Sequence, residues 1–311
     1  MFPTRFDSGP TVSAAIVNYN ARDALVACVA SLRAAGVGEI VVADNASTDG
    51  SEVALAAADP AVRFLAMGAN LGYGAAANRA VAATGGDLVL VGNPDLVVEP
   101  DSVAVLAEVL AADEGLALVG PRLTGADGVV YPSPRRFPGL VDAVGHAFIG
   151  LVAPRNRYTR RYRMLDDDRN RAGDAEWVSG SCFLVRRTAW EALGGFDEAY
   201  FMYAEDVDLC WRARRAGWRV GFEPAARVVH LQGVSTDLAP YRMIIRHHRS
   251  LLRFFRRSAR PVELALLPLV AAGLALRAGL ACGQRRFGSA LGPALGPAVG
   301  PAGPGPAGRD R

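Results

Sequence analysis

Four short clusters of Asn and Asp stand in the first third of the chain, each directly after an apolar run. The clusters are Asn18-Tyr19-Asn20, Asp44-Asn45, Asn70 and Asn93-Pro94-Asp95. In the last cluster, a carboxylate with a second oxygen ligand two residues before it could hold a hard divalent cation that bridges diphosphate oxygens. A single cluster could equally form a turn or a helix cap. Four in succession predict one binding site built from loops.

A second group with possible chemistry lies further along, where three carboxylates occur within four residues. Glu205, Asp206 and Asp208 follow a segment that contains Phe201 and Tyr203. A carboxylate held beside a substrate hydroxyl can accept its proton and serve as a general base. Acids also begin many solvent-exposed helices, because they complement the helix dipole. The aromatic residues before the cluster favour a binding site.

The elements that must position these residues alternate regularly between residues 11 and 113. Apolar, β-rich runs predict strands at 12–17, 40–43, 62–66 and 88–91. Ala-rich stretches of helical period predict helices at 23–35, 51–58, 75–83 and 101–112. This alternation is typical of βαβα units around a parallel sheet with helices on both faces. Ligands of such sheets bind outside the carboxyl ends of the strands, where the four polar clusters lie.

The rest of the chain has a different rhythm. Residues 155–171 contain seven Arg and predict a solvated loop. Beyond them, the pattern predicts a strand at 182–185, a helix at 205–216 that begins with the carboxylates, and a strand at 228–229 that leads to His230.

Composition excludes several classes of protein. The 34 residues counted as Lys or Arg are all Arg. Without Lys, P-loop NTPases and enzymes that form a lysine Schiff base are excluded. The four cysteines contain no C-x-x-C pair, which argues against a disulfide framework or a zinc site and favours a reducing cytosol. Residues 1–7 lack the apolar segment of a secretory signal, and no uncharged apolar run reaches the roughly 18 residues of a membrane span.

The C-terminal region is strongly basic. Residues 241–261 contain seven Arg and two His but no acid. Spacings of three and four place these arginines along one side of a helix, with Ile, Leu and Phe over much of the remainder. The apolar run 264–276 is too short to span a bilayer. Together they predict a helical region, 241–287, that binds an anionic membrane surface through its arginines from Arg242 to Arg260, rather than nucleic acid. Residues 288–311, rich in Gly, Pro and Ala, predict a disordered tail.

Taken in order, the motifs of residues 11–236 resemble those of glycosyltransferase family 2. They are Ile16-Val17-Asn18-Tyr19-Asn20, Val41-Val42-Ala43-Asp44-Asn45-Ala46-Ser47-Thr48-Asp49-Gly50, Asn70-Leu71-Gly72-Tyr73-Gly74-Ala75-Ala76-Ala77-Asn78, Asn93-Pro94-Asp95, Gly194-Gly195-Phe196-Asp197-Glu198, Glu205-Asp206-Val207-Asp208-Leu209 and Gly217-Trp218 leading to His230. The resemblance implies a GT-A nucleotide-diphospho-sugar transferase fold, α/β with a mostly parallel central sheet, over residues 11–240. Residues 1–10 would be a tail and 241–287 a membrane-associating helical segment. Within the family, the motifs look most like the rhamnosyltransferase branch.

The resemblance also implies roles for the residues of the donor site. Asp44 stands where the family binds the pyrimidine ring, and Asn18, Tyr19, Asn45, Asn78 and Asn93 would help to hold the nucleotide. Asp95 would coordinate Mg²⁺ or Mn²⁺ on the diphosphate, and His230 stands where some members complete the metal site. As a lone His at a strand end, His230 also fits a structural role. The family often has Asp where this chain has Asn93.

For the acceptor side, the resemblance implies that Asp206 is the general base of an inverting displacement. Glu205 and Asp208 would be supporting acids, and Trp177, Ser179 and Gly180 would form the acceptor wall. The expected reaction transfers a sugar, L-rhamnose from dTDP-rhamnose, to a lipid-linked or polysaccharide acceptor in cell-wall or surface-glycan synthesis. It would take place on the cytoplasmic face of the plasma membrane. Alternatives are a UDP-sugar-dependent transferase for galactosyl, galactofuranosyl or N-acetylglucosaminyl groups, and a non-catalytic nucleotide-sugar-binding relative.

Overall fold

The computed structural model describes residues 9–137, 139, 153, 156–162, 170–231 and 240–287. Its first half alternates strands and helices in the order β1 (Val12–Asn18), α1 (Arg22–Ala34), β2 (Glu39–Asp44), α2 (Ser51–Ala58), β3 (Arg63–Ala66), α3 (Tyr73–Ala82), β4 (Leu88–Gly92), β5 (Leu96–Val98) and α4 (Ser102–Ala112). Every residue of β1 and β4 is buried, which explains why both read as continuous apolar runs. The predicted strands and helices up to α4 are confirmed to within two residues at each end.

The second half completes the same sheet and adds helices. It comprises β6 (Leu116–Thr124), β7 (Val130–Tyr131), α6 (Arg157–Tyr162), β8 (Gly173–Ala175), β9 (Cys182–Arg186), α7 (Arg187–Leu193), α8 (Glu205–Arg215), β10 (Arg219–His230), α9 (Pro240–Ser258), α10 (Pro261–Leu264) and α11 (Leu267–Phe287). One expectation was wrong, because the basic stretch expected to be a loop contains the helix α6. The strand expected at 228–229 is the end of the longer β10, which ends at His230, and α9, α10 and α11 lie where a helical region was expected at 241–287. Most of residues 1–10 and all of 288–311, expected to be tails, lie outside the described residues.

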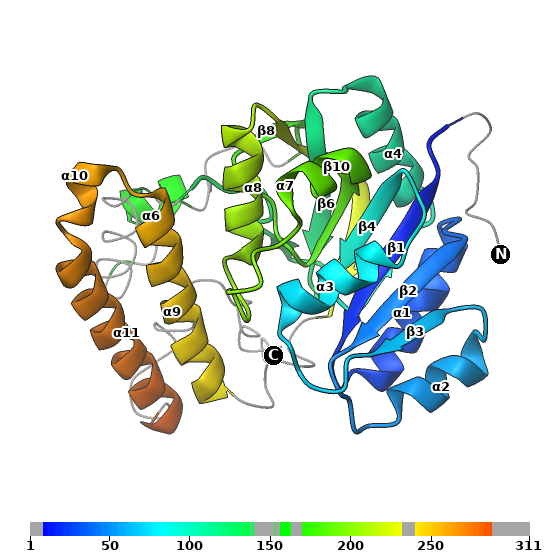
Figure 1. Ribbon diagram of the computed structural model, residues 1–311, viewed down its shortest axis with the longest axis horizontal. Helices are drawn as coiled ribbons and strands as arrows, with labels where there is room; N and C mark the ends of the chain where they lie inside the picture. Colours follow the sequence, from blue (N-terminus) through cyan, green and yellow to red (C-terminus); the bar gives the residue numbers. More distant parts are fainter. Residues whose placement is uncertain are drawn as a thin grey trace, which may run out of the picture.

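One mixed sheet forms the centre of the molecule, with the strand order β3-β2-β1-β4-β9-β6-β10-β5. On this path β9 and β5 run antiparallel to their neighbours, and the other pairs are parallel. Helices α1, α2 and α4 cover one face, where Leu25, Leu55 and Leu106 join its apolar core. Helices α3, α7 and α8 cover the other face (Figure 1), and the sheet therefore lies between two helical layers.

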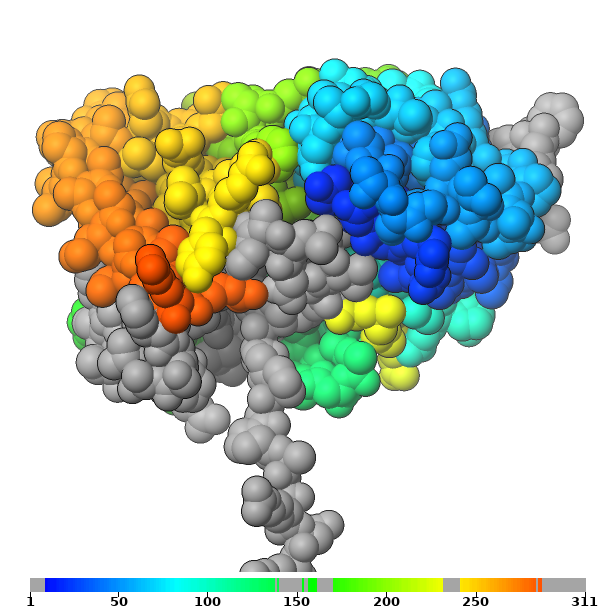
Figure 2. Space-filling model, turned by 90° about the horizontal axis from the view of Figure 1, so that it is seen from below, coloured from blue at the N-terminus to red at the C-terminus, as the bar shows by residue number. Residues whose placement is uncertain are grey.

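Helices α9, α10 and α11 form a separate layer outside α8. Figure 1 shows α9 and α11 as a hairpin beside α8, and Figure 2 shows these helices, in orange, at the opposite end of the molecule from the blue N-terminal part. Phe254 of α9 is buried against Trp211 of α8 and against Phe137. No helix among the described residues is both long enough and apolar enough to cross a membrane.

Candidate active site

The carboxyl ends of three neighbouring parallel strands bring the first polar clusters together. In the sheet register Asn18 at the end of β1 lies opposite Asp44 at the end of β2, and Ile16 lies opposite Gly92 at the end of β4. The Asn18 amide donates a 2.7 Å hydrogen bond from Nδ2 to Asp44 Oδ1. Both side chains are buried. The strand ends therefore form a common polar floor, as expected for this type of sheet.

Asp44 is oriented by Ser47, a residue that the sequence reasoning did not assign. The backbone N–H of Ser47 donates to Oδ2 at 2.8 Å, and its hydroxyl donates to Oδ1 at 2.5 Å. A carboxylate has about four lone-pair positions. Asn18 and Ser47 use three of them, which leaves one position on Oδ2 for a ligand N–H. Oδ1 of Asn18 is also buried and has no hydrogen-bond partner among the described residues, so it adds a second acceptor.

Two other residues expected at the nucleotide are bound within the protein. Asn45 accepts from Leu71 N–H at 3.1 Å and donates to Gly72 O at 3.2 Å, so its amide fixes the start of α3. Asn78 donates to Phe196 O at 3.0 Å and accepts from Phe196 N–H at 2.9 Å. These bonds make both amides braces between loops, and their contact with a nucleotide stays a prediction. Tyr19 lies half-buried in the loop after β1.

The antiparallel pairing of β5 with the end of β10 brings Asp95 beside His230. His230 lies opposite Leu96 in the register, and Leu231 N–H donates to Asp95 O at 2.9 Å. Nε2 of His230 lies 3.1 Å from Asp95 Oδ1 and 3.1 Å from Asn93 Nδ2. Although 137 residues separate Asn93 from His230 in the sequence, the fold makes them neighbours.

The donor set of this corner fits a divalent cation that is shared with a ligand. Asp95 Oδ1 is buried and, apart from its 3.1 Å contact with His230 Nε2, has no hydrogen-bond partner among the described residues. Nδ1 of His230 is also buried and has no such partner there. Nowhere among the described residues do three or more His, Cys, Asp or Glu side chains form a group that could hold a metal ion by themselves. A cation that takes few protein ligands and several diphosphate oxygens needs no such group.

The segment Gly180-Ser181 joins this corner to Asp206. Ser181 O accepts from Asn93 N–H at 3.0 Å. The N–H group of the preceding residue, Gly180, donates to Asp206 Oδ2 at 2.8 Å. A Cβ at position 180 would lie only 2.9 Å from the Cβ of Asp206. Glycine is therefore required there by the close approach of the two chains.

Asp206 itself lies half-buried in the first turn of α8. The N–H of Val207 donates to Oδ1 at 2.8 Å, so each carboxylate oxygen accepts one backbone hydrogen bond. Burial raises the pKa of Asp206 above its ordinary value, although these two bonds and the charge of Arg135 oppose the rise. A raised pKa makes the carboxylate a stronger base.

Glu205, the preceding residue, is buried more deeply than Asp206. Its Oε2 has no hydrogen-bond partner among the described residues. Burial, and then the charge of Asp206, raise the pKa of Glu205 well above its ordinary value. Both causes favour the neutral form of Glu205.

The backbone before α8 is strained. Tyr203 and Ala204 have φ values of 68° and 64°, in the left-handed region. Such conformations cost about 1–3 kcal/mol each and persist where surrounding contacts fix them.

Tyr73 of α3 is hydrogen-bonded to the segment Gly180-Ser181, because its hydroxyl donates to Gly180 O at 2.7 Å. Burial, and then the charge of Glu205, raise the pKa of Tyr73 well above its ordinary value.

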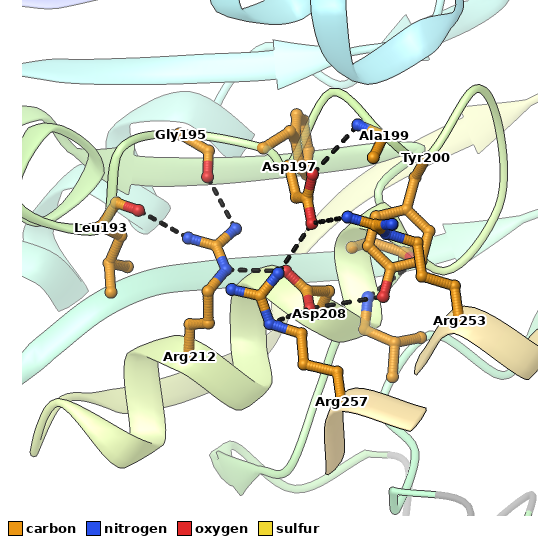
Figure 3. Close-up of polar contacts among 12 residues, drawn as sticks. Leu193, Gly195, Asp197, Ala199, Tyr200, Asp208, Arg212, Arg253 and Arg257 are labelled. Carbon is orange, nitrogen blue, oxygen red and sulfur yellow. Dashed lines mark hydrogen bonds and ion pairs between the residues drawn. The ribbon is translucent and has the colours of Figure 1, made fainter. Parts of the chain in front are cut away.

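Asp208 points away from this site, toward α9 (Figure 3). It is fully buried, and its Oδ2 accepts from Arg212 at 2.7 Å. Arg257 of α9 lies 3.3 Å from Oδ1. Arg212 also donates to the carbonyl groups of Leu193 and Gly195, at 2.6 and 2.7 Å. The geometry gives Asp208 a structural role that ties α7, α8 and α9 together.

The three residues expected to line the acceptor side, Trp177, Ser179 and Gly180, are all buried. Trp177 donates from Nε1 to Arg136 O at 2.9 Å, and its ring lies 5.1 Å from the guanidinium of Arg135. Ser179 donates to Ser181 Oγ at 3.0 Å. Arg135 is 2% exposed, and sequence reasoning missed it because its segment carries no regular pattern. Its buried charge favours anionic groups near Asp206.

Comparisons with known proteins agree with this arrangement. Glycosyl transferase family 2 matches residues 13–194, and Glycosyl transferase family group 2 matches residues 138–286. An N-acetylglucosaminyl-diphospho-decaprenol L-rhamnosyltransferase of Mycobacterium tuberculosis is 42% identical over 224 residues, which cover 68% of this chain and 72% of the relative. Rhamnosyltransferase WbbL of Escherichia coli is 28% identical over 145 residues, covering 46% and 52%.

The fold has a solved counterpart. Mannosyltransferase PcManGT from Pyrobaculum calidifontis, solved with GDP-Man and Mn²⁺, superimposes with a TM-score of 0.57 at 20% identity, over 94% of this chain and 82% of that one. The order of the strands in the sheet and the position of the site at their carboxyl ends define a GT-A-like transferase fold. The chain belongs to glycosyltransferase family 2 and is a glycosyltransferase.

Proposed function

We propose that this chain transfers L-rhamnose from dTDP-rhamnose to a hydroxyl of an N-acetylglucosaminyl-diphospho-polyprenol. The observation that carries the proposal is its similarity to the mycobacterial enzyme that is named for this acceptor and this sugar. Asp44 has one free acceptor position, which suits the ring N3–H of thymine. Uracil has the same N–H, and donor identity is therefore the first property to test.

In the proposed reaction Asp206 accepts the proton of the acceptor hydroxyl. The oxygen of that hydroxyl forms a bond to the anomeric carbon as the bond from that carbon to the diphosphate breaks. The electron pair leaves with dTDP, and attack from the opposite face inverts the configuration. Gly180 and Val207 hold the carboxylate in one orientation by their N–H groups, which reduces the entropy lost on reaching the transition state.

Asp95 and His230, with the amide of Asn93 beside them, would hold Mg²⁺ or Mn²⁺ on the donor. When bound, the cation supplies positive charge to the diphosphate and makes it a better leaving group. The mannosyltransferase of the same fold was solved with Mn²⁺, which supports this choice of cation. No Lys is available to neutralise the diphosphate.

A lipid-linked acceptor requires contact with a membrane surface, and the helices α9–α11 suit that contact. Residues 240–287 contain ten Arg and a single acid, Glu263. Val262, Leu269 and Leu276 are 73%, 70% and 57% exposed. Apolar side chains next to arginines bind anionic bilayers. Arg253 and Arg257 pair with Asp197 within the fold. The exposed arginines Arg242, Arg249 and Arg256 would face the lipid on the cytoplasmic side.

The experiment that tests the donor uses full-length protein with Mn²⁺, a short-chain N-acetylglucosaminyl-diphospho-lipid and a panel of dTDP- and UDP-sugars. Release of nucleoside diphosphate and mass spectrometry of the lipid are measured together. The proposal predicts a deoxyhexose added to the lipid with dTDP-rhamnose. Transfer from a UDP-sugar instead would assign a different donor. Tight binding of dTDP without turnover of any donor would make the chain a non-catalytic relative.

A further inference from the structure

The loop that precedes the catalytic helix is held from two sides. Residues 201–204 lead directly into Glu205 and Asp206. On one side, Tyr73 N–H at the start of α3 donates to Phe201 O at 2.9 Å. Gly72 packs so closely on Phe201 that a side chain there would clash with its carbonyl group. This contact comes from the donor half of the site.

The second contact comes from α9, in the region whose sequence pattern indicates membrane binding. The hydroxyl of Ser250 donates to Met202 O at 2.9 Å. The guanidinium of Arg246 stacks on the ring of Phe201, with 3.2 Å between its Cζ atom and the ring centroid. His247 packs edge-on against Tyr203, with 5.2 Å between ring centroids. Three side chains on one face of α9 thus contact three successive residues of the loop.

The position of α9 is itself fixed by the catalytic domain. Arg253 and Arg257 donate to Asp197 Oδ2 at 2.8 and 2.7 Å, and Phe254 is buried beneath them. His247 is buried as well, and burial lowers its pKa to about 3, so the ring packs as a neutral group at the pH of activity. Contacts in the C-terminal half of α9 therefore hold its loop-binding face against residues 201–204.

We propose that Arg246, His247 and Ser250 are positioning residues of the transfer reaction, and that α9 belongs to the catalytic machinery rather than serving only as a membrane contact. The left-handed backbone of Tyr203 and Ala204 requires an external clamp to persist. A loop released from α9 would relax and rotate the start of α8, which carries the carboxylate of Asp206. This inference rests on the proposed role of Asp206 as the base.

The test compares Ser250→Ala with Ser258→Ala in full-length protein. Ser258 is a matched control on the same helix, because its hydroxyl donates within the helix, to Phe254 O at 2.8 Å. Loss of the Ser250 hydrogen bond should lower kcat about three- to tenfold and leave the KM for the sugar donor unchanged. Ser250→Thr, which retains a hydroxyl, should recover activity. Arg246→Gln provides a second, half-buried variant should Ser250→Ala fold poorly.

Thermal unfolding of the same samples separates positioning from general support. Should Ser250→Ala and Arg246→Gln lower the Tm but keep the native kcat well below the transition, α9 only stabilises the fold and the proposal is overturned. An equal kcat for Ser250→Ala and Ser258→Ala would overturn it too. Asp206→Asn, assayed alongside, reports on the base independently: native activity there refutes the role of Asp206, whatever the α9 variants do.

Discussion

Replacing Asp208 by Asn distinguishes a structural acid from a catalytic one. Asp208 is 0% exposed and pairs with Arg212, whose side chain is 14% exposed. Neutralising one partner of a buried ion pair costs about 3–5 kcal/mol. Arg212 keeps its bonds to Leu193 O and Gly195 O, so we expect a loss near the lower end, about 3 kcal/mol. For a chain of this size each kcal/mol lowers the Tm by about 2–4 °C, which gives a fall of about 6–12 °C.

The assay is thermal unfolding by circular dichroism, with Asp197→Asn as the matched control. Asp197 pairs with Arg253 and Arg257, which are 45% and 38% exposed, and exposed pairs contribute about 0–1 kcal/mol. Asp208→Asn should therefore unfold at a clearly lower temperature than Asp197→Asn, with kcat preserved well below the transition. A native Tm combined with a large loss of kcat would refute this reasoning and make Asp208 a supporting acid.

Three further outcomes follow from the site. Gly180→Ala should lower kcat by about 100-fold, because the new Cβ displaces Asp206, whereas Gly173→Ala, with open space around it, should keep native kinetics. The acid limb of the kcat/KM profile should lie above the ordinary Asp pKa of 3.8, since burial raises the pKa of Asp206 and activity is lost as pH falls through that value; a limb at or below 3.8 would contradict the assignment. Leu269→Glu should weaken sedimentation with anionic vesicles, and binding that is unchanged would remove α11 from the membrane contact.

Much of the fold could be predicted, because the first half of the chain is locally consistent. Strands, of which β1 and β4 are fully buried, alternate with short helices there. Parallel strands must end at the same edge, so Asn18 and Asp44 were expected together. The strands β5 and β6 were missed, since β5 has only three residues and pairs with a strand far along the chain. The long-range pairing that brings His230 to Asp95 has no local signal, and only the family resemblance indicated it.

The roles of the acidic cluster were harder to separate. Residues two apart on a helix do not face the same way, so Asp206 and Asp208 must point to different surroundings. The spacing alone does not say which of the two faces the site. The same limit applies to α9, whose arginines have one periodicity but several partners: Arg253 binds Asp197, and Arg246 stacks on Phe201. The spacing of the arginines predicted a single basic surface on α9. The tertiary contacts show that some of these arginines bind other parts of the protein instead.

The central claim is that Asp206 removes the proton of the acceptor hydroxyl during rhamnosyl transfer. Its most direct test is the single-turnover rate of Asp206→Asn with dTDP-rhamnose and the N-acetylglucosaminyl-diphospho-lipid, beside dTDP affinity measured by calorimetry and Glu191→Gln as an exposed control. The account predicts a loss of about 100- to 10,000-fold in the rate, with dTDP affinity and the control unchanged. A single-turnover rate equal to that of the native protein would contradict it.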